Sequence, residues 1–93
     1  MLALSDTEVA RRLSRMPEWR LQGNAISRIF AFPDFVIALG FVNRVAEAAE
    51  SAGHHPDIDI RYNRVMLSLS THDAGGITEK DFELASQIDR LSD

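Results

Sequence analysis

The three histidines of this 93-residue chain, His54, His55 and His72, all lie within one short stretch of its second half. Imidazole is the side chain whose ordinary pKa is nearest to neutral pH, so it can give or take a proton under physiological conditions. Two segments with the alternation of β-strands separate the histidine pair from His72. A hairpin formed by them would return His72 toward the pair, so the pattern predicts a site for proton transfer.

Carboxylates near these histidines could orient an imidazole or hold a polar ligand group. Glu50 lies four residues before His54, at the end of a predicted helix, and it could equally be a solvated charge. Asp73 directly follows the third histidine, and either role is open to it. Asp81 has a structural explanation, because it stands three residues after Thr78 and would complete a capping box there.

A zinc site is the other chemistry that three histidines could provide. The chain has no HExxH motif or comparable ligand spacing. Adjacent residues in an extended segment also point to opposite sides, which separates His54 from His55. Metal binding is therefore less favoured than proton transfer.

Composition narrows the class of protein. With 45% hydrophobic and 26% charged residues, the chain is expected to fold as a single globular domain over residues 1–93. The net charge of −4 without a basic stripe disfavours nucleic acid as a partner. Cysteine is absent, which excludes disulfides and thiolate chemistry. No signal peptide or membrane-spanning run is apparent, so we expect a cytoplasmic protein without a membrane partner.

The elements that must position the histidines can be predicted from periodicity and capping signals. Ser5 and Glu8 predict a capping box at the start of a first helix, which ends before Pro17. Strands are predicted at 19–22 and 25–32, joined by a Gly-Asn turn. A long helix is predicted to open at Pro33 and Asp34 and to run to about Ala52.

The second half repeats this arrangement. Strands are predicted at 57–62 and 65–70, with Tyr62 sharing the inward face of the first, and residues 71–76 are predicted to form a loop. A final helix is predicted to be capped by Thr78 and Asp81. The order is α-β-β-α-β-β-α. We therefore predict an α+β fold, a four-stranded and largely antiparallel sheet with three helices on one side.

The long helix has two apolar stripes where a surface helix usually has one. The second stripe indicates burial either deep in the same domain or against another subunit. The first stripe consists of Phe35, Leu39, Val42, Ala46 and Ala49, and the second of Ile37, Phe41, Val45 and Ala48.

The histidines also belong to a longer pattern of an acid, a His-His-Pro run, an aromatic residue and a third histidine. Its residues are Glu50, His54, His55, Pro56, Tyr62 and His72. In this spacing the chain resembles the pterin-4a-carbinolamine dehydratases, also called 4a-hydroxytetrahydrobiopterin dehydratases. The resemblance extends over nearly the whole chain and includes the surroundings of Trp19 and Phe35.

This resemblance implies a lyase that removes water from a 4a-hydroxy-tetrahydropterin to give the quinonoid dihydropterin, without metal, nucleotide or redox cofactor. It assigns His54 and His72 to the acid and base roles. His55 would position the substrate and could assist proton transfer. The implied substrate-binding residues are Glu50, Pro56, Thr71, Asp73, Ala74 and Asp81.

The resemblance also implies partners. Members of the family form dimers and tetramers, so a homodimer or homotetramer is expected beside the small pterin substrate. Animal members additionally serve as dimerisation cofactors of a homeodomain transcription factor, so a non-catalytic interaction protein on the same fold is the alternative. The presence of all three histidines together with Glu50 and Asp73 favours the enzyme.

Overall fold

The structure is a computed structural model, and it describes residues 2–92. Its elements follow the predicted order, with one added 3-10 turn, η1, in the expected loop. They are α1 (Asp6–Leu13), β1 (Arg20–Gln22), β2 (Ala25–Ala31), α2 (Phe35–Ala52), β3 (Asp57–Arg61), β4 (Arg64–Leu69), η1 (His72–Ala74) and α3 (Glu79–Leu91).

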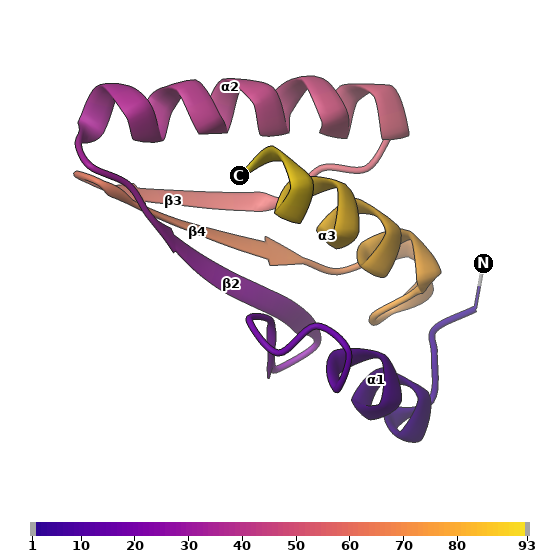
Figure 1. Ribbon diagram of the computed structural model, residues 1–93. Coiled ribbons are helices and arrows are strands. Elements are labelled where there is room, and N and C mark those ends of the chain that lie inside the picture. The colour runs from indigo at the N-terminus through magenta and orange to yellow at the C-terminus, as the bar shows by residue number, and fades with distance from the viewer. Residues whose placement is uncertain (1, 93) are drawn as a thin grey trace.

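The four strands form one antiparallel sheet in the order β1-β2-β4-β3. Helices α2 and α3 lie on the same side of it, and α1 lies near the start of α3 (Figure 1). The predicted α+β class and strand pairing are confirmed. No helix within residues 2–92 has both the length and the apolar character required to cross a bilayer.

The core lies between the helices and the inward face of the sheet. Phe41 of α2 is fully buried against two aromatic rings that enter from the β2 side, with centroid distances of 4.8 Å to Phe30 and 4.9 Å to Phe32. Other buried residues are Val9, Trp19, Ile26, Val45, Val65, Leu67, Leu69, Phe82, Leu84 and Ile88. This packing fixes α2 and α3 relative to the hairpin that carries the histidine loops.

The helix starts follow the capping signals, with two corrections. The Ser5 hydroxyl accepts the Glu8 N–H as predicted, but the Glu8 carboxylate bonds to Arg11 and Arg12, so the reciprocal half of the capping box is replaced by ion pairs. Pro33 is not the first helical residue. Asp34 is the N-cap of α2 and accepts the Ile37 N–H, which leaves proline outside the helix.

Strands β1, β2 and β3 are each one residue shorter than the alternation predicted, and β4 is shifted by one residue. Tyr62 is the clearest difference. It does not share the inward face of β3, because the strand ends at Arg61 and Tyr62 begins the turn to β4. Its φ of 51° is in the left-handed region, and its side chain is 67% exposed. Asn63 fixes this turn by donating from its side-chain amide to the Phe32 carbonyl.

Neither predicted stripe of α2 faces one environment along its whole length. The buried positions are Phe41 and Val45 of the second stripe, Ala49 of the first, and Ala38, which belongs to neither. Exposed apolar surface instead gathers in the first turn, where Phe35, Val36 and Ile37 are 45%, 76% and 48% exposed. We call these three residues the α2 apolar patch.

Candidate active site

The two histidine loops leave the same end of the β3–β4 hairpin. Arg61 pairs with Arg64 at its turn, and Asp57 pairs with Ser68 at the opposite end. The segment with His54 and His55 enters β3 at that opposite end, and the segment with His72 leaves β4 there. The predicted return of the third histidine toward the first two is therefore the consequence of this register.

Gly53 sets the direction in which the chain leaves α2. Its φ of 63° and ψ of 32° form a left-handed C-cap, which glycine adopts without the steric cost of a Cβ. His54 N–H then bonds to the Ala49 carbonyl and closes the helix end. The backbone of His54 is thus fixed at the end of α2.

The His54 ring is bound to Asp81 at the start of α3. His54 Nε2 lies 2.5 Å from Asp81 Oδ1, and the side chains are 11% and 0% exposed. Asp81 also completes the predicted capping box, because its Oδ2 accepts the Thr78 N–H at 2.9 Å. The helix cap is therefore only one part of what this carboxylate does.

Thr71 connects the same carboxylate to the loop of His72. Its hydroxyl donates to Asp81 Oδ2 at 3.0 Å and lies 2.7 Å from the Thr78 hydroxyl. The backbone of Thr71 also forms an isolated bridge with Gly76. Asp81 consequently joins three segments, the end of α2, the residue before His72 and the start of α3.

His55 has a different environment. Its Nε2 lies 2.5 Å from Glu50 Oε1, and both side chains are largely exposed, at 62% and 77%. Of the roles left open for Glu50, the structure shows a contact with an imidazole, that of His55, made by a carboxylate that is also exposed to solvent. Pro56, partly buried, separates this pair from the start of β3.

His72, Asp73 and Ala74 form the 3-10 turn η1, which the predicted loop did not include. The side chains of His72 and Asp73 are exposed, and they form no hydrogen bond with any residue in the range 2–92. Gly75 closes the turn with a φ of 72°. These two side chains are therefore open to solvent beside the loop that Thr71 ties to Asp81.

One residue of the sequence pattern lies apart from the histidines. Tyr62 is at the turn end of the hairpin, so the structure does not bring this member of the sequence pattern to the others.

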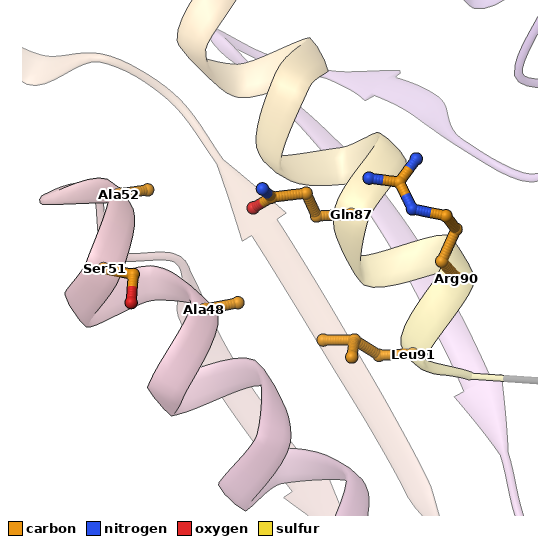
Figure 2. A pocket seen from close by; sticks show the side chains of 6 residues that line it. All are labelled: Ala48, Ser51, Ala52, Gln87, Arg90 and Leu91. Carbon is orange, nitrogen blue, oxygen red and sulfur yellow. The ribbon is translucent and has the colours of Figure 1, made fainter.

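A cavity of about 420 Å³ opens between the ends of α2 and α3 (Figure 2). It is lined by Ala48, Ser51, Ala52, Gln87, Arg90 and Leu91, and sequence patterns gave no indication of it. Within residues 2–92 no three His, Asp or Glu side chains are grouped so as to hold a metal ion.

Comparison with known proteins agrees with the geometry. The family model described as Pterin 4 alpha carbinolamine dehydratase matches residues 2–91. The chain belongs to this family. A relative from Acidobacterium capsulatum is 59% identical, and one from Chloroflexus aurantiacus 57% identical. The matches cover 98% of this chain in both cases, and 99% and 98% of the respective relative. Both are named "Putative pterin-4-alpha-carbinolamine dehydratase".

Solved structures of this pterin dehydratase family show the same architecture. A transcriptional coactivator/pterin dehydratase from Brucella melitensis superposes with a TM-score of 0.92 at 35% identity, covering 98% of this chain and 99% of that one. A pterin dehydratase-like protein, described as a RuBisCO assembly factor in the alpha-carboxysome, gives a TM-score of 0.69 at 27% identity and covers 81% and 89%. Proteins that share this fold are thus described with different roles.

Proposed function

We propose that the chain is a hydro-lyase that removes water from a 4a-hydroxy-tetrahydropterin and releases the quinonoid dihydropterin. The observation that carries this proposal is the His54 ring, anchored on a buried carboxylate and joined through Thr71 to the loop of His72, in a chain of the pterin dehydratase family. Two imidazoles on neighbouring loops suit a reaction that requires one acid and one base.

The reaction is balanced by two proton transfers. The bond between C4a and the hydroxyl oxygen breaks as an acid protonates that oxygen, and the proton on N5 is taken by a base while a C=N bond forms. We assign these roles to His54 and His72. No electron leaves the substrate, so the step itself has no need of a redox partner.

The remaining residues of the site would hold the substrate. We propose that the exposed pair of His55 and Glu50 positions the pterin, and that His55 can assist proton transfer. Asp73 and the backbone at Ala74 would bind the polar edge of the ring system, because both lie in the exposed turn η1 beside His72. Pro56 would shape the loop that enters β3.

An interaction protein is the second candidate function. It is supported by the α2 apolar patch and by the two proteins of similar structure that are described as a coactivator and an assembly factor. The histidines distinguish the two candidates, because a docking function on α2 would not need them. A binding role that survives loss of His54 and His72 would favour this alternative.

The direct test is the ultraviolet absorbance of chemically prepared carbinolamine, followed with a metal chelator present. Wild type is compared with His54→Ala and His72→Ala, and the rate without protein is subtracted. Each substitution should lower the rate by about 10²- to 10⁴-fold, the usual contribution of one general acid or base. Gln87→Ala, in the cavity between α2 and α3, is the control and should react like wild type. Equal rates for all four proteins would exclude the assignment.

A further inference from the structure

The hydrogen bonds around Asp81 leave only one consistent placement of the protons. The Lys80 N–H donates to the Thr78 hydroxyl, and the Thr78 N–H donates to Asp81 Oδ2. Since the Thr71 hydroxyl donates to the same Oδ2, the Thr78 hydroxyl must donate to Thr71. Every polar atom of this buried cluster is then satisfied, and Asp81 Oδ1 remains as the acceptor for His54.

This network fixes the proton on one nitrogen of the His54 ring. Asp81 as a carboxylate can only accept, so His54 Nε2 must be the donor to Oδ1. The hydrogen bond at one ring nitrogen determines the tautomer and leaves the other nitrogen for chemistry. Nδ1 of His54 is therefore the nitrogen whose proton can be exchanged.

A nitrogen that exchanges a proton with a substrate must be accessible, and Nδ1 of His54 is. It forms no hydrogen bond within residues 2–92, and in that range Arg28 Nε is the one buried side-chain nitrogen or oxygen without a partner. Nδ1 of His54 must therefore retain solvent-accessible surface. Asp81 has no such surface, since its side chain is 0% exposed and its contacts go to protein groups.

We propose that Asp81 is a positioning residue that keeps a proton on His54 Nε2, so that Nδ1 is the atom that exchanges a proton with the substrate. This rests on the proposed dehydratase function, and it replaces the direct substrate contact predicted for Asp81. The proposal is the same whether His54 acts as acid or base, because either role uses the ring nitrogen that is not hydrogen-bonded to Asp81.

Asp81→Asn provides a sharp test because the orientation of the new amide is determined. The Thr78 N–H is a fixed donor, so the amide oxygen must take the place of Oδ2. The amide NH₂ then faces His54 and donates to Nε2, which moves the ring proton to Nδ1. The variant should keep the packing of the site and reverse the tautomer.

The experiment combines long-range ¹H–¹⁵N correlation of the histidine rings with steady-state kinetics. At about pH 9, where imidazoles are neutral, wild type should have His54 protonated on Nε2 and Asp81→Asn should have it protonated on Nδ1. The kcat of the variant should fall by at least about 10²-fold, and its KM should change much less. Asp89→Asn is the matched control, because Asp89 is also a carboxylate of α3 that accepts from a ring N–H, that of Trp19, away from the histidines. It should leave kcat and the His54 tautomer unchanged.

Each outcome of the NMR and kinetic measurements supports or overturns a stated part of the proposal. A wild-type ring protonated on Nδ1 overturns the proposal even if Asp81→Asn does not fold. A reversed tautomer with kcat close to the wild-type value overturns the catalytic role of Nδ1. If wild type does not accelerate dehydration, the proposed function fails, and the catalytic part of this proposal fails with it. The spectrum then still decides whether Asp81 orients the ring.

Discussion

His54 and His55 are neighbours in sequence, but their carboxylate partners differ in burial. Asp81 is 0% exposed, whereas Glu50 is 77% exposed. Removal of one partner from a buried charged hydrogen bond leaves the other without compensation, whereas an exposed pair is already solvated. The two histidines should therefore contribute very differently to the free energy of unfolding.

We predict that His54→Ala destabilises the protein by about 2–3 kcal/mol, because the buried Asp81 carboxylate loses a donor. His55→Ala, the matched substitution one residue later, should cost at most about 1 kcal/mol. Urea denaturation with an unchanged m-value would measure both. Equal losses for the two variants would contradict the contrast in burial.

Among the helices, α2 offers a comparison of two glycines. Gly53 adopts a left-handed conformation at the C-cap of α2. Gly40 lies within the helix, and a Cβ added there would contact only Arg44 Nη1, at an ordinary distance of 3.7 Å. Gly40→Ala should stabilise the protein by about 0.5–1 kcal/mol through helix propensity. Gly53→Ala should destabilise it by about 1–2 kcal/mol and lower activity by displacing His54. Thermal unfolding would measure both, and a stabilising Gly53→Ala would refute the role of this cap.

Helix α1 should respond to acid through Glu8. Hydrogen bonds from Arg11 and then Arg12 lower the pKa of Glu8 from 4.5 to about 2. A lowered pKa means that the stabilisation is fully present above pH 4.5 and is lost as the pH falls from 4.5 toward 2. The difference in Tm between wild type and Glu8→Gln should therefore shrink over that interval, and added salt should reduce it at neutral pH. A difference in Tm that stays constant from neutral pH down to about 2 would contradict this role of Glu8.

The elements could be predicted largely because their signals are local. The Thr78–Asp81 capping box and the Gly53 stop are fixed by residues within one turn of the chain. Alternation alone did not reveal that β3 ends before Tyr62, because an exposed aromatic in a turn continues the same pattern. The contact between His54 and Asp81 joins residues 27 positions apart, so it depends on the packing of α3 against α2 and could not be predicted from spacing.

For the whole molecule, the α2 apolar patch poses the question of what covers it. We propose that copies of the chain associate through this patch. It shares only Ile37 with the second apolar stripe, whose Phe41 and Val45 are buried in the chain's own core. Val36 is 76% exposed, so Val36→Lys should be harmless in a monomer but should place a charge inside such an interface.

Light scattering at micromolar concentration should therefore show an oligomer for wild type and a smaller species for Val36→Lys. Glu47→Gln on the same helix changes the net charge by the same amount and should leave the mass unchanged. A monomeric wild type would contradict the proposal. Sequence could indicate excess apolar surface on α2, but only the fold could show which residues of the two stripes remain exposed.

Trp19 and the histidine network differ greatly in the length of chain that they close. The Asp81 network lies within residues 54–81, whereas the indole N–H of Trp19, the one tryptophan of the chain, bonds to Asp89 at 2.8 Å across 70 positions. Because the entropy of loop closure rises with loop length, contacts within the shorter segment can form before the two ends of the chain meet. During refolding, tryptophan fluorescence should therefore report the joining of the termini, while the imidazole resonances report assembly of the half that carries the histidines.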